Sequence, residues 1–379
     1  MIHAFFWGSL FLIFFSYLGY PVSLGIIRFF RKNELKRKLI TPFVSFIITA
    51  YNEENKIREK LDNTLQTNYP RELLQIIVAS DGSTDRTNDI VRSYSAYNIN
   101  LIELPEHMGK EAAQVQAIKA ATGEILIFSD TATRIDPESI SNIVSNFSDP
   151  TVGCVSSEDR IISSVNGQTV SGEGLYVRYE MWLRRIESSI NSVVGLSGSF
   201  FAARRSVCAD LTSLFQSDFK ILLNTVKKGM RGISDPTSVG LYSDLSDTSR
   251  EFNRKVRTVL RGLTVFFSNI EFLDFFRYGF FSYQFICHKL LRWMAPLFLV
   301  GSFLGSMLLS FSSSFYFYIF ITQFFFYLSA IAVLVKPSLI RVPLFKVALF
   351  FVQVNISIAV AWYKYIRGDR IVSWQPSVR

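Results

Sequence analysis

The 379-residue sequence is short of charged residues, cysteines and histidines. Asp, Glu, Lys and Arg together make up 19% of it, below the roughly one quarter that is typical of soluble domains. Its three cysteines, Cys154, Cys208 and Cys287, stand far apart, and its three histidines form no zinc-binding pattern with them. These shortages exclude a disulfide scaffold and a zinc site, and they favour buried, reduced thiols.

Apolar and basic residues are plentiful instead. Hydrophobic residues make up 49% of the chain, 36 residues are phenylalanine, and the net charge is +9. This composition excludes a disordered chain. The positive charge suits an anionic lipid surface, a phosphorylated substrate or nucleic acid. The overall composition does not distinguish a soluble protein rich in apolar residues from a membrane protein. The positions of the apolar residues along the chain distinguish the two.

The first apolar stretch predicts a retained membrane span within residues 1–32. It runs from about Phe5 to Phe30 without a charge before Arg28, and about 20 residues cross a bilayer. Lysines and arginines follow it at once, whereas a cleavable signal peptide carries its positive charges first. The positive-inside rule then places Met1 outside and the next segment in the cytoplasm.

The C-terminal region predicts about three further membrane helices within residues 294–365. The apolar stretches are Met294–Phe311, Ser314–Val335 and Val342–Trp362. The basic loop Lys336–Arg341 is expected inside. Three crossings would place the tail, 366–379, outside although it is basic. The last stretch is alternatively re-entrant or interfacial, but three crossings are the expectation.

Between these regions, residues 41–249 read as an α/β domain. Predicted strands at Phe43–Thr49, Leu74–Ala79 and Glu124–Phe128 alternate with predicted helices at Ile57–Gln66, Asp85–Tyr94 and Glu111–Ala120. Such alternation is typical of a mostly parallel, doubly wound sheet with helices on both faces.

Acidic residues follow all three predicted strands, in the segments Thr49–Glu54, Ser80–Asp85 and Ser129–Thr131. Ligands of open α/β sheets bind beyond the carboxyl ends of the strands. Each acid taken alone could belong to a turn or a helix cap. Three acidic strand ends together favour a nucleotide or polyhydroxyl ligand with a divalent cation, because carboxylate oxygens suit Mg²⁺ and Mn²⁺.

The segments Thr49–Glu53, Ser80–Thr87 and Phe128–Asp130 resemble the opening motifs of family 2 glycosyltransferases. The resemblance covers about Thr41 to Trp293. It implies a GT-A fold, a Rossmann-like mixed sheet, in a cytoplasmic domain joined to α-helical transmembrane segments. The nucleotide-binding residues that it implies are Tyr51, Glu53, Asp81, Lys110 and Asp130.

The family's Asp-x-Asp metal motif falls on Asp130-Thr131-Ala132, where alanine replaces the second acid. The resemblance implies that Asp130 holds Mg²⁺ or Mn²⁺, with the donor's diphosphate supplying most other ligands. One or two carboxylates plus phosphates are enough for Mg²⁺. The departure puts the strength of metal binding in doubt.

The resemblance assigns the catalytic base to Asp218, although Ser217 stands where the family has another acid. A helix cap is the structural alternative for this position. The acceptor-binding residues that the resemblance implies are Gly198, Ser199, Phe200, Arg292 and Trp293. Phe200 could equally be a core residue. Arg292 and Trp293 match only half of a Gln-x-x-Arg-Trp signature, because Lys289 replaces its glutamine, and they could instead anchor the chain at the membrane interface.

Residues 250–293 are predicted to connect the domain to the membrane. Within them, Arg250–Leu263 has arginines on one helical face and apolar residues on the other. Such a helix typically lies in the membrane interface. A helix that packs on the soluble domain is the alternative.

The expected function is that of an inverting glycosyltransferase of the plasma or inner membrane. The chain resembles hyaluronan, chitin and cellulose synthases, which implies transfer from a nucleotide-sugar, expected to be a UDP-sugar, to a growing polysaccharide or glycolipid at the cytoplasmic face. Alternatives are a single addition to a polyprenyl-linked acceptor and a degenerate, non-catalytic subunit. The expected partners are the donor, a glycan or lipid-linked acceptor and the bilayer, without nucleic acid, and a homo-oligomer stays open.

Overall fold

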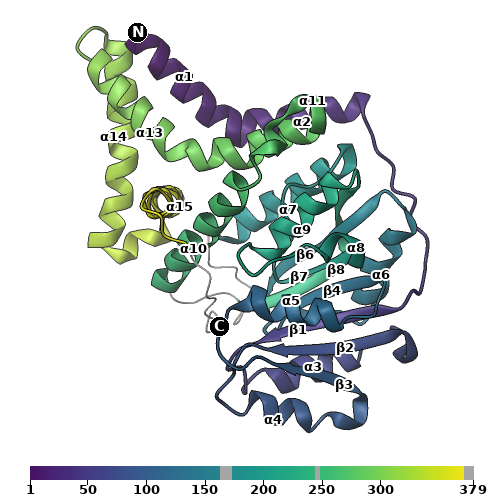
Figure 1. Cartoon of the computed structure of the whole chain (residues 1–379). Helices are drawn as coiled ribbons and strands as arrows, with labels where there is room; N and C mark the ends of the chain where they lie inside the picture. Colours follow the sequence, from purple (N-terminus) through teal and green to yellow (C-terminus); the bar gives the residue numbers. More distant parts are fainter. Residues whose placement is uncertain (163–172, 244–247, 371–379) are drawn as a thin grey trace.

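The computed structural model describes residues 1–162, 173–243 and 248–370 (Figure 1). The strands are β1 Val44–Ala50, β2 Leu74–Ser80, β3 Ile99–Glu103, β4 Ile125–Asp130, β5 Arg134–Ile135, β6 Val152–Ile162, β7 Phe200–Arg204 and β8 Arg231–Ser243. The helices among them are α3 Ile57–Leu65, α4 Thr87–Arg92, α5 Lys110–Ala120, α6 Ser139–Ser145, α7 Glu173–Ile190, α8 Arg205–Cys208 and α9 Ser217–Lys227. The predicted strands and helices are therefore confirmed to within a few residues.

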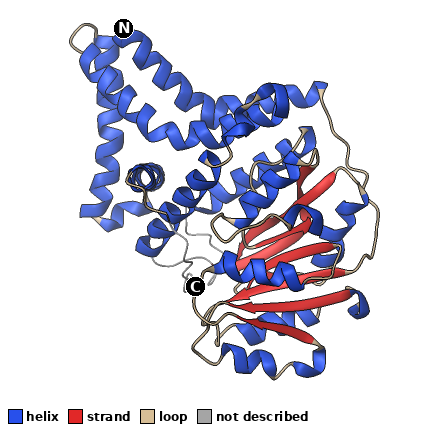
Figure 2. Cartoon of the chain, viewed as in Figure 1, coloured by secondary structure: helices blue, strands red, loops and turns tan. Residues whose placement is uncertain are grey.

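All eight strands form one mixed sheet in the order β3-β2-β1-β4-β7-β6-β8-β5. Strands β1 to β4 pair in parallel, while β7 runs antiparallel to both of its neighbours, β4 and β6. Helices cover both faces of this sheet (Figure 2). This arrangement confirms the predicted GT-A-like α/β fold. It also places the carboxyl ends of β1, β2 and β4 along one edge, where ligands of such sheets bind.

Two apolar cores form because the central strands are buried on both faces. Every residue of β1 is buried, and Ile47 belongs to one core whereas Phe46 and Ile48 belong to the other. The alternation follows from the two-residue period of a strand. All three cysteines are buried and free of disulfides, as predicted.

The membrane-side helices are α1 Ile2–Phe14, α2 Tyr20–Phe30, α10 Thr248–Phe267, α11 Phe275–Tyr278, α12 Phe280–Phe285, α13 Leu291–Leu309, α14 Ser314–Val335 and α15 Pro343–Ile366. Four described stretches are long and apolar enough to cross a membrane: Ile2–Phe30, Phe280–Leu309, Ser314–Val335 and Pro343–Ile366. Helix α1 packs closely on α13, because Gly301 and Gly305 face α1. Small residues at such contacts let membrane helices approach each other.

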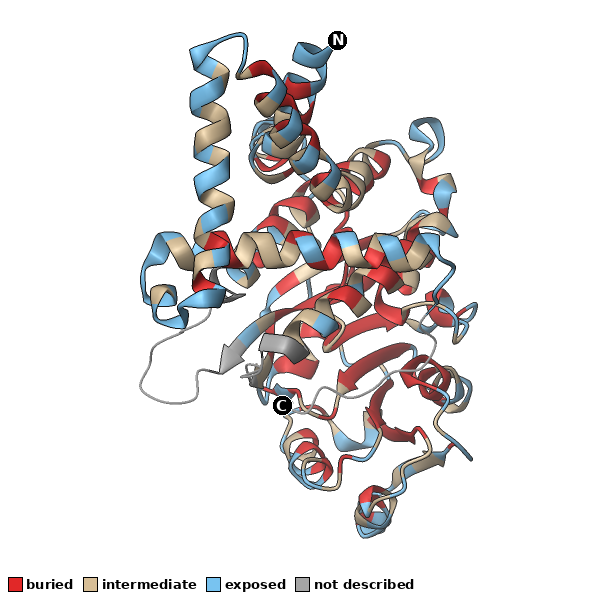
Figure 3. Ribbon diagram, turned by 90° about the vertical axis from the view of Figure 1, so that its left-hand side faces the viewer, coloured by how far each residue is buried: buried red, intermediate tan, exposed pale blue. Residues whose placement is uncertain are grey.

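Helix α15 is oriented differently from the other three long apolar helices. In Figure 1, α1, α13 and α14 run along the plane of the page, whereas α15 is seen end-on. The view turned by 90° shows α15 lying across the upright α14 (Figure 3). The sequence predicts three C-terminal crossings, with a re-entrant or interfacial last segment as the alternative, and both stay predictions for α15.

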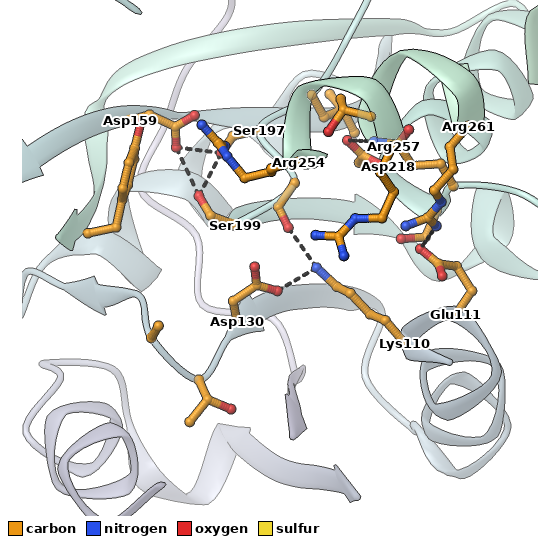
Figure 4. Close-up of a pocket in the computed structure, with 18 of the residues that line it drawn as sticks. Lys110, Glu111, Asp130, Asp159, Ser197, Ser199, Asp218, Arg254, Arg257 and Arg261 are labelled. Atoms are coloured by element: carbon orange, nitrogen blue, oxygen red, sulfur yellow. Dashed lines mark hydrogen bonds and ion pairs between the residues drawn. The ribbon is translucent and has the colours of Figure 1, made fainter. Parts of the chain in front are cut away.

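The predicted amphipathic helix is α10, and it connects the two parts of the molecule. Its apolar face, which includes Val256, Leu260 and Leu263, packs against Ala361 and Trp362 of α15. Arg254, Arg257 and Arg261 point the other way, toward the carboxyl edge of the sheet (Figure 4). The helix is therefore held between α15 and the domain.

Candidate active site

A pocket of about 340 Å³ lies at the carboxyl edge of the sheet (Figure 4). The charged residues that line it are Glu53, Lys110, Glu111, Asp130, Asp159, Arg184, Asp218, Arg254, Arg257 and Arg261. They come from the segment after β1, the end of β4, the interior of β6 and helices α5, α7, α9 and α10. Five acids and five bases in one pocket provide both proton-accepting groups and a place for an anion.

Asp130 and Lys110 form an ion pair on the floor of the pocket. Asp130 is the last residue of β4, which pairs in register with Thr49 of β1. Lys110 begins α5, directly after Gly109, whose φ of +102° suits only glycine. The Lys110 Nζ also donates a hydrogen bond of 3.0 Å to the Gly198 carbonyl oxygen. The lysine thus links the metal-motif strand to the predicted acceptor segment.

Asp218 lies across the pocket in the first turn of α9, and only 8% of it is exposed. The Gln216 Nε2 donates to its Oδ2 at 3.1 Å. Burial raises the pKa of this carboxyl above its ordinary value, although the charges of Lys110 and Arg261 act in the opposite direction. A raised pKa makes a carboxylate a better proton acceptor near neutral pH.

Gly198 stands where the pocket wall approaches Asp218 most closely. A Cβ at this glycine would lie 3.2 Å from the Asp218 Oδ2. Ser197 and Ser199, on either side, donate hydrogen bonds of 2.5 and 2.9 Å to the Oδ1 of Asp159 in β6. Asp159 therefore holds the predicted acceptor segment in place. A single acid within a strand matches no motif, so this role could not be predicted from the sequence.

The arginines of α10 were expected to face the membrane surface, but three of them face the pocket. Arg254, Arg257 and Arg261 line the pocket, and Arg261 forms an ion pair with Glu111 of α5. They are three and four residues apart, so they share one helical face. Burial and the neighbouring Arg261 and Arg254 charges lower the pKa of Arg257. Such crowding of like charges suits an anionic ligand.

Two of the other residues predicted to contact the nucleotide lie outside this pocket. Among the described residues, Glu53 lines this pocket whereas Tyr51 and Asp81 do not. The Asp81 carboxylate accepts a backbone hydrogen bond from Gly109 at 2.8 Å, and the His107 Nδ1 lies 2.9 Å from it. The Tyr51 ring stacks on His107 with 3.9 Å between centroids. Asp81 therefore fixes the loop that positions Lys110, and its contact with a nucleotide stays a prediction.

Comparison with known protein families matches a segment of the chain that forms part of this pocket. Residues 45–212 match the family model described as glycosyl transferase family 2. This segment is a family 2 glycosyltransferase domain. It includes Lys110, Asp130 and Asp159, and α9 and α10 complete the pocket from beyond the matched residues.

Curated relatives match the same region of the chain. A poly-β-1,6-N-acetyl-D-glucosamine synthase of Staphylococcus aureus (strain MSSA476) is 26% identical over 204 residues, which cover 52% of this chain and 48% of the relative. The synthase of Staphylococcus epidermidis is 27% identical over 172 residues, 44% of this chain and 41% of the relative. The chain thus spans about half the length of the curated relatives that it matches.

A solved structure covers nearly the whole chain. The mannosyltransferase of Pyrobaculum calidifontis, in complex with GDP-Man and Mn²⁺, is 21% identical and has a TM-score of 0.75. The match covers 98% of this chain and 100% of that one. The likeness shows the fold, including the arrangement of the membrane-side helices around the glycosyltransferase domain.

Phe200 does not lie where the family resemblance implied. Its side chain is fully buried in the core with Phe46 and Ile127, at the start of β7. A ring in that position cannot stack on a sugar in this pocket. Side chains alternate along the strand, so Phe200 packs in one core and Phe201 packs in the core on the other face of the sheet. Phe201 is also fully buried, and it stacks on Phe128.

Arg292 and Trp293 lie between the glycosyltransferase domain and the membrane helices. Arg292 forms a buried ion pair with Glu180 of α7, and His288 lies 3.2 Å from the same carboxylate. Burial acts to raise the pKa of Glu180, but the charges of Arg292 and His288 hold it well below its ordinary value. The Trp293 carbonyl oxygen accepts a hydrogen bond of 2.8 Å from Trp362. Both residues therefore have structural partners, and acceptor binding stays a prediction for them.

Proposed function

We propose that the domain transfers a sugar, with inversion, from a UDP-sugar to a hydroxyl of a glycan or lipid-linked acceptor. One observation carries this proposal: the buried Asp218 carboxylate and the Asp130–Lys110 pair line the same pocket of a family 2 glycosyltransferase domain. That arrangement supplies a base on one side of a reacting carbon and charge for the leaving group on the other.

The reaction needs one bond to form and one to break. The acceptor oxygen bonds to the anomeric carbon, and the bond from that carbon to the donor's diphosphate breaks. Asp218 takes the proton of the acceptor hydroxyl. Lys110 and the arginines of α10 stabilise the negative charge of the departing nucleoside diphosphate, as fixed positive groups in a water-poor site can.

A divalent cation could be held in this pocket only if the substrate supplied some of its ligands. Asp130 presents a carboxylate whose side chain is 31% exposed, but the described residues contain no group of three His, Cys, Asp or Glu side chains that could hold a metal. We therefore propose that Asp130 holds Mg²⁺ or Mn²⁺ together with the diphosphate oxygens. The cation would add Lewis-acid stabilisation of the leaving group.

We further infer that the protein is embedded in the membrane with its N-terminus outside and the domain in the cytoplasm. With α15 lying along the membrane surface, the basic loop Lys336–Arg341 and the basic residues Lys364 and Arg367 all stay on the cytoplasmic side. The conflict between charge and topology then disappears. An engineered cysteine in place of Asp369 should react with an impermeant reagent only in inside-out vesicles. Labelling of right-side-out vesicles would refute this topology.

The decisive experiment is a screen of nucleotide-sugars with the purified full chain and mass analysis of the product. Transfer from a UDP-sugar that stops on metal chelation is expected. Asp218→Asn should lower turnover by about 10²- to 10⁴-fold without loss of nucleotide binding. The exposed Asp210 provides a matched control, because Asp210→Asn should change neither.

Each outcome of the screen tests a different part of the proposal. Transfer from GDP-sugars alone would overturn the choice of donor. Full turnover by Asp218→Asn would refute the base, and activity in chelator would refute the metal. A protein that acts on no donor in the screen would be the non-catalytic subunit that Ala132 and Ser217 leave open as an alternative. A ladder of product masses would indicate a polymerising enzyme, and a single added sugar would indicate the alternative of one addition.

A further inference from the structure

A small apolar notch lies on the membrane side of the molecule, where α2 meets α11 and α12 (Figure 1). Its volume is about 380 Å³, and the residues that line it are Ile27, Phe275, Gly279, Phe280 and Tyr283. The hydroxyl of Tyr283 is already hydrogen-bonded to the Ser23 hydroxyl at 2.6 Å. The side chains of the notch therefore offer a ligand only apolar contact. Among the described residues, the notch shares none with the active-site pocket.

The notch lies where the first two of the four long apolar stretches have their ends. Ile27 is near the end of the first stretch, and Phe280 begins the second. The two stretches run antiparallel, because a Cβ at Gly305, near the end of the second, would lie 3.0 Å from Phe6, near the start of the first. If both stretches cross the bilayer, their ends at the notch therefore lie in the same leaflet.

Exposed phenylalanines lie next to the residues that line the notch. Phe29 and Phe30, at the end of α2, are 87% and 88% exposed, and Phe276 of α11 is fully exposed. The opposite face of α2 packs on α7 of the domain through Tyr20 and Leu24. Large apolar side chains that gather on one surface mark a contact with lipid or with another protein. Their position at the ends of two apolar stretches favours lipid.

Three arginines accompany the same residues. Arg28 and Arg31 stand at the end of α2, and Arg277 lies in α11. All three are exposed, and among the described residues none of them forms an ion pair. The guanidinium of Arg31 lies over the Phe280 ring, 5.5 Å from its centroid, and so at the wall of the notch.

The acids that are nearest in the sequence do not neutralise these arginines. Glu34 pairs with Lys32, and Asp274 accepts hydrogen bonds from the backbone N–H groups of Phe276 and Arg277. Solvated arginines are common on protein surfaces, but these stand beside an apolar notch. An amphiphile with an anionic head complements both features.

We propose that the notch binds an anionic phospholipid of the bilayer. One acyl chain occupies the notch, the phosphate lies at the three arginines, and the exposed phenylalanines insert among the neighbouring lipids. A zwitterionic phospholipid fills the notch equally well but gains less from the arginines, because its head group carries a cation of its own. This lipid is a component of the membrane and takes no part in sugar transfer, so the proposal does not depend on the transferase function.

Tryptophan fluorescence of the purified full chain, reconstituted in bilayers of phosphatidylcholine and phosphatidylglycerol, tests the proposal. Phe275→Trp places a tryptophan in the wall of the notch, and the signal of the five natural tryptophans is measured separately and subtracted. Phe276→Trp is a second reporter, because that side chain is fully exposed and its replacement disturbs no packing. Lipids with brominated acyl chains quench a tryptophan that they touch, so bromine on one lipid at a time shows which lipid occupies the notch.

The quenching should show that phosphatidylglycerol is enriched at the notch at least about fivefold over its share of the bilayer. That enrichment corresponds to about one arginine near an anionic lipid surface. Quenching by the two lipids in proportion to their shares would refute the preference for an anionic head. Quenching of the reporters by neither lipid would refute lipid contact at the notch.

Variants in the reporter background locate the head group. Arg28→Gln, Arg31→Gln and Arg277→Gln should each lower the enrichment, and the triple variant should abolish it. Arg341→Gln is the matched control, because Arg341 belongs to a basic membrane-side loop on the far side of the molecule (Figure 1). It should leave the enrichment unchanged. Enrichment that survives the triple substitution, or that falls equally in the control, would refute the three arginines as the head-group site.

Discussion

Lys60 offers a quantitative test of the electrostatics beneath the active site. This lysine of α3 is 2% exposed. Its Nζ donates hydrogen bonds of 2.7 Å to the Ser129 hydroxyl and 2.6 Å to the Thr133 carbonyl oxygen. Burial lowers its pKa from the ordinary 10.5 to about 7, even though the nearby Asp130 acts to raise it. The folded protein therefore holds this proton far less tightly than the unfolded chain does.

The size and sign of the effect follow from linkage. A pKa lowered from 10.5 to about 7 corresponds to roughly 5 kcal/mol of differential stability. Below about pH 7, Lys60 is charged in both the folded and the unfolded state. The folded protein is then destabilised by the full free energy of burying this charge. Between the two pKa values the unfolded chain binds more protons, so the free energy of unfolding rises with pH. The cost disappears above about pH 10.5.

We expect Lys60→Met to remove this pH dependence. The variant also loses two hydrogen bonds, but that loss is the same at every pH, and all other titrating groups cancel when the two proteins are compared. The stability of the variant relative to the natural chain should therefore fall by about 3 kcal/mol between about pH 7 and about pH 9.5. In melting temperature this is on the order of 10 °C.

Thermal unfolding of both proteins in one detergent at a series of pH values provides the measurement. A difference in melting temperature that stays constant across the range would show that Lys60 titrates at its ordinary pKa. Water would then reach the floor of the pocket, and the picture of a buried cation beneath Asp130 would be refuted.

Two further predictions concern the base. Arg261→Gln should move the acid limb of the pH–rate profile to higher pH, and Glu111→Gln should move it to lower pH, because their charges respectively lower and raise the pKa of Asp218. Shifts in the same direction, measured as turnover against pH, would contradict this. Gly198→Ala places a Cβ 3.2 Å from the Asp218 Oδ2 and should displace that carboxylate by a few tenths of an ångström. Turnover should then fall about tenfold with little change in the KM for the donor, and an unchanged turnover would show that the position of this oxygen is not critical.

The site residues at the strand ends could be predicted from the sequence because parallel strands all end at the same edge of the sheet. Residues that follow successive strands of a doubly wound sheet meet at one edge, so Glu53 and Asp130 were identified from local patterns alone. Asp218 needed the family resemblance, since nothing within α9 distinguishes a base from a helix cap. Residues that act through distant partners gave no local signal, and these include Asp159 and Lys60.

The orientation of an amphipathic helix is the other feature that the sequence left undetermined. A basic face indicates only that negative charge lies on that side, and phospholipid headgroups and phosphorylated substrates both supply it. The apolar face of α10 could equally have met lipid. Its actual partner is α15, which presents apolar residues to it, so Arg254, Arg257 and Arg261 face the pocket.

The position of α10 also makes the active site depend on the membrane part of the protein. Three arginines that line the pocket belong to a helix whose other face is held by α15, and Arg261 ties that helix back to α5 through Glu111. Residues 45–212 alone contain the Asp130–Lys110 pair but lack both Asp218 and the arginines. The matched residues thus form only part of the pocket, and α10, which packs on α15, supplies three of its arginines.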